Sequence, residues 1–301
     1  MKDSIGFVGI GVMGLPMLAN LARSGQFHIF AYDTASGPFD ILEKEPAFNQ
    51  TLVRAESLEY LEQCTTVITM LPNSRVTNAV ILGDGERSGL AHILGRGSTI
   101  IDMGSSDPAE TLRLLPILAD RGIHLIDAPV SGAAAKARAG DLAIMVGGDA
   151  DCVEKLRPIL SCMGGHLIAA GKPGAAHAMK ALNNYVYAAG LLAASEAVAI
   201  AEAMQLDTDI FTDILNASSG RNVATETKLK PFILPRNYAG GFALALQAKD
   251  LAIANGLQSL AGMEAPQLML CATLWAEAEA TLPPGADNTA IHQFIRERRV
   301  R

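Results

Sequence analysis

Short apolar runs alternate with helical patterns over roughly the first half of the chain. Strand-like runs rich in Val, Ile, Leu and Phe occupy residues 4–9, 27–33, 66–71, 98–103, 123–127, 142–147 and 166–170. Helical spacing is found at 13–24, after Asp107-Pro108 and at 151–160. Continuous apolar strands that alternate with helices predict a doubly wound, mostly parallel α/β sheet covered on both faces.

The pattern changes after Gly171-Lys172-Pro173-Gly174. Residues 175–205 contain no helix breaker except Gly190, which predicts one helix of about 30 residues, roughly 45 Å long. Further helices are predicted at 207–217, 225–234, 243–260, 265–279 and 289–298, without a convincing strand. We therefore expect two domains, an α/β domain over 1–165 and an all-α domain over 166–301, with the long helix between them.

The first strand runs into Gly9-Ile10-Gly11-Val12-Met13-Gly14, which fits the pattern G-x-G-x-x-G. In this pattern Gly9 allows a tight turn, Gly11 lets the backbone approach a pyrophosphate, and Gly14 lets helix and strand pack closely. The helix start at Val12 and Met13 offers unpaired N–H groups to the phosphates. The string therefore predicts a dinucleotide-binding Rossmann domain.

Asp33 ends the second strand, about 20 residues after the glycine turn, as this motif requires. Its carboxylate suits the adenosine ribose hydroxyls and repels a 2′-phosphate, and Thr34 supplies no compensating cation. We expect NAD as the cofactor, with NADP as the disfavoured alternative. The strand ends at Leu71-Pro72 and Ser105 should lie along the same edge of the sheet and flank the nicotinamide side.

Two further features carry candidate chemistry. Asp127-Ala128-Pro129-Val130-Ser131-Gly132 follows the fifth strand, where Ser131 and Gly132 either bind a carboxylate or form a plain turn. Lys180 and Asn184 share one face of the long helix. Small apolar neighbours and a cationic nicotinamide would disfavour a charged Lys180, which suits a general acid/base; a solvated lysine is the alternative.

These strings together resemble the β-hydroxyacid dehydrogenase family, over nearly the whole chain. The matching blocks are Gly6 to Gly14, Asp127 to Gly132, Lys180 to Asn184, and Phe242 with Lys249-Asp250-Leu251. The resemblance implies that Lys180 is the acid/base, that Asn184 holds the substrate, that Ser131 and Gly132 bind its carboxylate, and that Lys249 approaches the cofactor. It also implies a Rossmann domain followed by an all-α domain whose long helix lies at a dimer interface.

Several residues depart from the family pattern or extend it. Ala133 stands where a second glycine usually follows, so its methyl group either narrows the carboxylate site or removes a backbone conformation. Met103-Gly104 stands where relatives often have small hydroxyl residues. Lys136 is either solvated or favours a second acidic group on the substrate. Arg221 is a candidate anion contact, with a surface loop as the alternative.

The composition of the chain restricts which binding partners and which cellular compartment are expected. The net charge of -7 argues against nucleic acid, and the C-terminal Arg296, Arg298, Arg299 and Arg301 are interpreted as a solvated helix end. Four cysteines without C-x-x-C spacing and the scattered histidines predict reduced thiols, a cytoplasmic location and no metal site. The apolar helix is interpreted as buried rather than membrane-spanning, and it favours a homodimer or homotetramer over a monomer.

The expected activity is NAD-dependent hydride transfer to or from a short 3-hydroxy acid or its semialdehyde, of the 3-hydroxyisobutyrate type. Reduction of tartronate semialdehyde or another small semialdehyde is the alternative. A phosphogluconate dehydrogenase is disfavoured because Asn183 replaces a histidine, and an imine reductase because Lys180 is present. A cofactor-binding regulatory protein without turnover is disfavoured by the presence of Lys180, Asn184 and Ser131.

Overall fold

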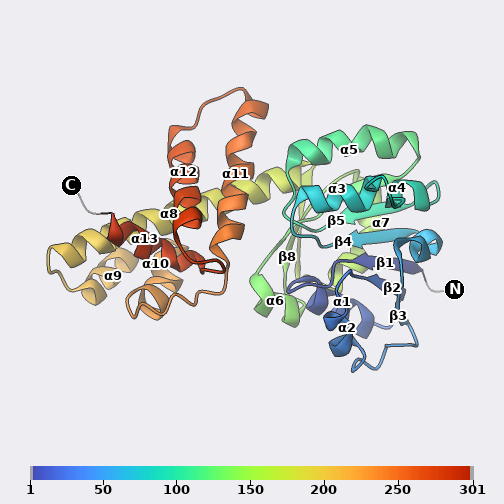
Figure 1. The fold of residues 1–301 in the computed structure, drawn as a ribbon, viewed down its shortest axis with the longest axis horizontal. Helices are drawn as coiled ribbons and strands as arrows, with labels where there is room; N and C mark the ends of the chain where they lie inside the picture. The colour runs from blue at the N-terminus through green and yellow to red at the C-terminus, as the bar shows by residue number, and fades with distance from the viewer. Residues whose placement is uncertain (1–2, 299–301) are drawn as a thin grey trace. The chain divides into compact units, whose positions relative to one another are not determined.

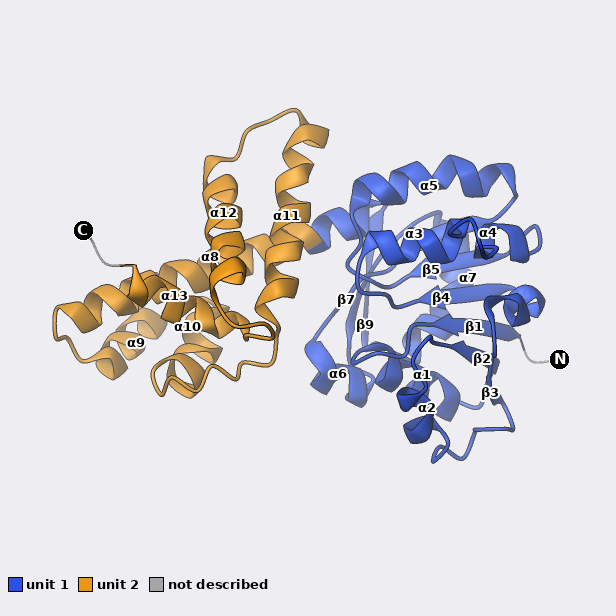
Figure 2. Cartoon of the chain, viewed as in Figure 1, with its two compact units in different colours: residues 1–180 blue, residues 181–301 orange. Residues whose placement is uncertain are grey.

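The computed structural model describes residues 3–298 and divides the chain into two compact units (Figure 2). The first unit is Met1–Lys180 and the second is Ala181–Arg301, so the division falls inside the long helix α8 (Ala175–Ala203). The sequence placed the division at residue 165. Residues 166–171 belong to the first unit because they form β9 (His166–Gly171), which pairs with β8 (Ala143–Gly147) in the sheet.

The first unit is built on a nine-stranded sheet of order β3-β2-β1-β4-β5-β6-β8-β7, with β9 also paired to β8. All neighbouring strands are parallel except β6 with β8 and β7 with β8, which confirms the mostly parallel sheet. The remaining strands are β1 (Ser4–Val8), β2 (His28–Tyr32), β3 (Leu52–Arg54), β4 (Thr66–Thr69), β5 (Thr99–Asp102), β6 (His124–Asp127) and β7 (Val130–Ser131).

Neighbouring residues of the central strands supply separate hydrophobic cores on the two faces of this sheet. In β4, Val67 packs in one core and Ile68 in the other, and Ile100 and Ile101 of β5 do the same. One core is covered by α1, α2 and α7, and the other by α3, α4 and α5. In Figure 1, α3, α4 and α5 lie on one side of the strands, and α1 and α2 lie on the other. The helices are α1 (Gly14–Arg23), α2 (Gly37–Leu42), α3 (Ser74–Leu82), α4 (Leu90–Ile93), α5 (Pro108–Asp120), α6 (Ala133–Ala139) and α7 (Ala150–Ser161), with a 3-10 helix η1 (Leu58–Gln63).

Among its described residues the second unit contains helices and loops but no β-strand, as the sequence predicts. Its core gathers around Trp275, which is fully buried. Beyond α8 the helices are α9 (Thr208–Ala217), α10 (Val223–Thr227), the π-helix η2 (Leu229–Ile233), α11 (Leu244–Ala261), α12 (Pro266–Thr281), the 3-10 helix η3 (Asn288–Ala290) and α13 (Ile291–Glu297). Arg296 pairs with Glu202 and Arg298 with Glu277, whereas Arg299 and Arg301 lie outside the described residues.

One predicted helix, over 225–234, is divided in the structure into α10 and η2. Pro231 has no N–H, and in a regular helix its ring clashes with the carbonyl group four residues earlier. The backbone widens instead, so that the N–H of Ile233 donates to the carbonyl of Lys228 at 3.1 Å and that of Leu234 donates to Leu229 at 2.9 Å. The proline therefore explains the difference.

Among residues 3–298, α8 is the one helix long and apolar enough to cross a bilayer by length and composition, with 39% of its most apolar window buried. A core helix of a soluble protein passes the same test.

Candidate active site

The glycine turn between β1 and α1 is held tightly by the protein's own backbone at two of its three glycines. Gly9 has φ +98° and donates its N–H to the carbonyl of Tyr32 at 3.0 Å. A side chain at Gly9 would clash with the carbonyl oxygen of Met70, and one at Gly14 with the carbonyl oxygen of Gly9. The fold itself therefore requires glycine at both positions.

Gly11 is different. A Cβ atom added there would have no neighbour within 4 Å, and its φ lies outside the left-handed region. Packing of the described chain thus gives no reason for glycine, whereas close approach of a pyrophosphate does. Next to it Val12 is 81% exposed and Met13 immediately precedes α1, so this helix start is open to an anion. The turn fits a dinucleotide.

Asp33 lies beside this turn, at the end of β2. Its Oδ2 accepts the N–H of Ile10 at 2.6 Å and its Oδ1 accepts the N–H of Ala35 at 2.8 Å. The two bonds fix the carboxylate against the glycine turn while leaving lone pairs on both oxygens. The structure therefore brings the two parts of the predicted dinucleotide motif together.

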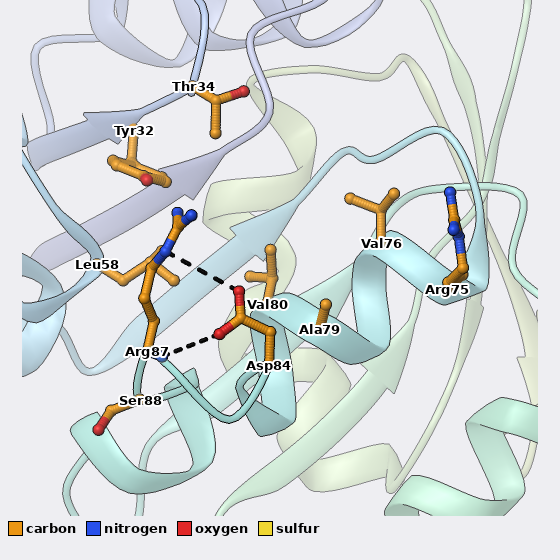
Figure 3. Close-up of a pocket in the computed structure, with 10 residues that line it drawn as sticks. All are labelled: Tyr32, Thr34, Leu58, Arg75, Val76, Ala79, Val80, Asp84, Arg87 and Ser88. Carbon is orange, nitrogen blue, oxygen red and sulfur yellow. Dashed lines mark hydrogen bonds and ion pairs between the residues drawn. The ribbon is translucent and has the colours of Figure 1, made fainter.

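A cavity of about 310 Å³ opens next to Asp33, with Tyr32 and Thr34 on one side and α3 on the other (Figure 3). In this view Arg87 extends towards Tyr32, and its guanidinium lies 3.9 Å from the Asp84 carboxylate. Arg75 also lines the cavity. Neither arginine is predicted from the sequence. Arg75 lies on α3 (Ser74–Leu82), a helix that the hydrophobic pattern does not predict, and Arg87 lies in the loop between α3 and α4.

The loops that follow β4 and β5 meet at the same edge of the sheet. A Cβ atom on Gly104 would lie 2.9 Å from the carbonyl oxygen of Leu71, so the two loops are in close contact. Pro72 is exposed beside them, and Ser105 is half-buried. The positions predicted to flank the nicotinamide are therefore adjacent through their backbones.

The predicted carboxylate turn includes β7, of which Ser131 is the last residue, and Gly132 follows directly. Ser131 and Gly132 are half-buried, and Gly132 has φ +139°. Ala133 has φ +54°, a left-handed conformation that glycine adopts more readily. The methyl group at this departure from the family pattern therefore does not prevent the left-handed backbone. Lys136 forms an ion pair with Asp141 at 3.4 Å, and both side chains are about half exposed.

Lys180 is half-buried on α8, one helical turn before Asn184. Asn184 is 9% exposed and donates Nδ2 to Oδ2 of Asp250 at 2.5 Å. Lys249 Nζ lies 3.1 Å from Oδ1 of the same carboxylate. Asp250, to which the sequence pattern assigns no role, therefore fixes the Asn184 amide and joins it to Lys249.

Arg221 lies in the loop between α9 and α10. Its side chain is 65% exposed and pairs with Glu226 at 3.4 Å. Within the second unit, the structure thus brings together Asn184, Asp250 and Lys249, whereas Arg221 is engaged at the surface.

Comparison with known proteins assigns the class. Residues 4–171 match the NAD binding domain of 6-phosphogluconate dehydrogenase, and residues 174–295 match the NAD-binding domain of NADP-dependent 3-hydroxyisobutyrate dehydrogenase. The chain is 35% identical to 2-(hydroxymethyl)glutarate dehydrogenase of Eubacterium barkeri, over 83% of this chain and 80% of that one. It is 32% identical to mitochondrial 3-hydroxyisobutyrate dehydrogenase of Homo sapiens, over 98% and 88%.

A solved structure gives the same result. The 3-hydroxyisobutyrate dehydrogenase of Mycobacterium tuberculosis, determined with L-serine, superposes with a TM-score of 0.86 at 28% identity, covering 98% of this chain and 100% of that chain. The fold, the glycine turn and these matches define an NAD(P)-dependent oxidoreductase acting on CH–OH groups. Within that class, the chain belongs to the β-hydroxyacid dehydrogenase family.

Proposed function

We propose that this protein transfers a hydride between NAD and a short 3-hydroxy acid or its semialdehyde, of the 3-hydroxyisobutyrate type. The observation that carries the proposal is the pairing on α8 of Lys180 with Asn184, whose amide is fixed by a buried carboxylate. A lysine and an oriented amide one helical turn apart can serve one reacting oxygen, the first by exchanging its proton and the second by a hydrogen bond.

The chain's own groups have separate roles. The turn Gly9 to Gly14 and Asp33 would hold the dinucleotide, and Leu71, Pro72, Ser105 and Lys249 would line its nicotinamide half. When bound, the nicotinamide accepts the hydride from the carbinol carbon or returns it to the carbonyl carbon. Ser131 and Gly132 would anchor the substrate carboxylate.

In this proposal Lys180 accepts or donates the proton. In oxidation its neutral amine takes the proton of the substrate hydroxyl group as the C–O bond becomes a carbonyl. In reduction its ammonium group donates a proton to the oxygen that would otherwise become an alkoxide. Asn184 orients that oxygen, so the protein contributes mainly orientation and electrostatics.

NAD is the cofactor we propose, and the position of Asp33 beside the glycine turn supports it. A carboxylate there accepts hydrogen bonds from ribose hydroxyls and repels a 2′-phosphate. Arg75 and Arg87 in the neighbouring cavity are the groups that could oppose this preference. Titration calorimetry with NADH and NADPH tests it, and tighter binding of NADPH would refute it.

Turnover tests the reaction. NADH consumption with methylmalonate and tartronate semialdehydes, and NAD reduction with 3-hydroxyisobutyrate, L-serine and 2-(hydroxymethyl)glutarate, identifies the substrate class. Lys180→Ala should lower kcat by about 10²- to 10⁴-fold with NADH binding unchanged. Undiminished turnover would refute the role of Lys180, and cofactor binding without turnover on any substrate would favour a regulatory protein.

We also propose a homodimer or homotetramer in the cytoplasm. Large apolar side chains are exposed on α8 and α9, among them Val186 at 68%, Ile200 at 61% and Ile210 at 59%. Burying such a surface between copies is favourable. The four free cysteines are typical of a reducing compartment. Sedimentation velocity tests the assembly, and a monomer at micromolar concentration would refute it.

A further inference from the structure

A row of buried polar side chains crosses the ends of three neighbouring strands. Thr69, Asp102 and Asp127 are the last residues of β4, β5 and β6, and the pairing register places them side by side. Asp102 is 4% exposed and Asp127 is fully buried. Two carboxylates in such positions require hydrogen-bond donors, and the donors come in part from the start of α8.

Asp127 holds the beginning of α8 through the backbone. Its Oδ1 accepts the N–H of Gly174 at 2.8 Å, and its Oδ2 accepts the N–H of His177 at 3.0 Å. The neighbouring strand leaves space for this, since a Cβ atom on Gly147 would lie 2.5 Å from Oδ1 of Asp127. The carboxylate thus satisfies helix-start donors that have no partner within the helix.

His177 adds a second anchor through its side chain. The ring is 1% exposed, and its Nδ1 lies 2.8 Å from the hydroxyl group of Thr111 on α5. Its Nε2 faces Oδ2 of Asp102 at 3.8 Å. Asp102 is itself fixed, with Oδ2 accepting the hydroxyl of Ser106 at 2.6 Å and Oδ1 accepting the hydroxyl of Thr69 at 3.1 Å. The imidazole ring therefore joins α8 to α5, and its Nε2, which is buried without a hydrogen-bond partner among the described residues, faces the sheet.

We propose that His177, held by Thr111 and Asp127, is a positioning residue for Lys180. This inference rests on the proposed role of Lys180 as the acid/base. His177 and Lys180 are three residues apart and therefore neighbours on the surface of α8. Asp127 fixes the backbone at the start of α8, and the imidazole contact with Thr111 adds a side-chain anchor to α5 that restrains rotation of the helix about its axis.

A small rotation of α8 about its axis would move the end of the Lys180 side chain enough to lower the rate. Side-chain ends lie about 6 Å from a helix axis, so a rotation of about 10° displaces them by about 1 Å. A displacement of that size can cost about 10²-fold in rate. Loss of the His177–Thr111 contact should therefore reduce kcat without removing any group that touches the substrate or the cofactor.

Thr111→Val removes the hydroxyl group and keeps the shape of the side chain. We expect kcat per NADH-binding site to fall about 10-fold or more, with the Kd for NADH within twofold of wild type, and Thr111→Ser to restore kcat. His177→Leu breaks the contact from the other side, and the double variant should be no slower than the slower single variant.

Thr212→Val is the matched control. Thr212 is a buried threonine in α9 whose hydroxyl donates to the carbonyl four residues earlier, at 2.8 Å, as that of Thr111 does at 3.3 Å. It should leave kcat unchanged. If Thr111→Val lowers only the melting temperature, or if both valine variants lower kcat equally, the contact is merely structural and the proposal is overturned.

Lys180→Met in the same assay separates the two hypotheses. If it is inactive while Thr111→Val and His177→Leu turn over like wild type, the positioning role is wrong and the proposed function stands. If Lys180→Met turns over like wild type, the acid/base role fails, and the positioning role fails with it.

Discussion

Replacing Gly11 by alanine separates the needs of the fold from the needs of the cofactor. Gly9 and Gly14 have backbone carbonyl oxygens where their Cβ atoms would lie, so the protein needs glycine there with or without a ligand. Gly11 has open space around its absent Cβ atom and a φ that other residues adopt. A methyl group at Gly11 should therefore meet nothing until a dinucleotide binds.

The two expected effects have opposite signs. Alanine at a compatible glycine position raises the free energy of unfolding by about 0.4–1 kcal/mol, mainly because the unfolded chain loses conformational freedom. The pyrophosphate, held away from the turn, would lose one charge-assisted hydrogen bond, worth about 1.5–3 kcal/mol. The Kd for NADH should thus rise by about 10- to 150-fold while the apo protein becomes slightly more stable.

Calorimetric titration with NADH and urea unfolding of the apo protein measure the two effects. Gly95→Ala is the matched control, because Gly95 also has no neighbour within 4 Å of an added Cβ atom and lies in a loop remote in sequence from the turn. Gly95→Ala should leave NADH binding unchanged. Gly11→Ala with wild-type affinity for NADH, or with a destabilised apo protein, would refute the reasoning.

Three further predictions concern stability and reactivity. Ala133→Gly should raise the free energy of unfolding, measured in urea, by about 0.5–1 kcal/mol. Ala133 has φ +54°, and a left-handed backbone costs about 1–2 kcal/mol for a residue with a Cβ atom. The greater conformational freedom of glycine in the unfolded chain offsets part of this gain. Burial lowers the pKa of His292 to about 4, so between about pH 4 and 6.5 the unfolded state binds more protons than the folded state. The free energy of unfolding should therefore fall by up to about 3 kcal/mol as the pH is lowered from about 6.5 to 4. Urea unfolding at several pH values should show this fall for the wild-type protein and not for His292→Phe. Burial raises the pKa of the Cys64 thiol to about 12 and that of Cys271 to about 11, so a disulfide reagent at pH 8 should modify these two only after unfolding; fast modification in the native protein would contradict their burial.

The long elements could be predicted because burial on both faces leaves a readable pattern. The first strand has no charged residue from Ser4 to Val8, and α8 has no breaker except Gly190. By contrast, β3 has three residues and β7 has two, too few for an alternation to be visible. These strands form because β2 and β8 offer them hydrogen-bond partners, which is tertiary information.

The candidate site divides in the same way. The glycine turn and Asp33 are close in sequence and have a known spacing, so the sequence predicts their meeting, and the structure shows Asp33 bonded to Ile10. His177, Thr111 and Asp102 have no such spacing: 66 residues separate Thr111 from His177. Asp102 ends β5, Thr111 lies on the helix that follows it, and His177 lies near the start of α8. These side chains come together only because the strand order places the end of β5 close to the start of α8.

The departures from the family pattern near the carboxylate turn also acquire a physical account. Ala133 takes a left-handed backbone conformation, which costs stability for a residue with a Cβ atom. The aliphatic part of Lys136 packs against Gly132, since a Cβ atom added to Gly132 would lie 2.7 Å from the Cβ atom of Lys136. The ammonium group of Lys136 pairs with Asp141. Because that charge already has a partner, it gives little reason to expect a second acidic group on the substrate.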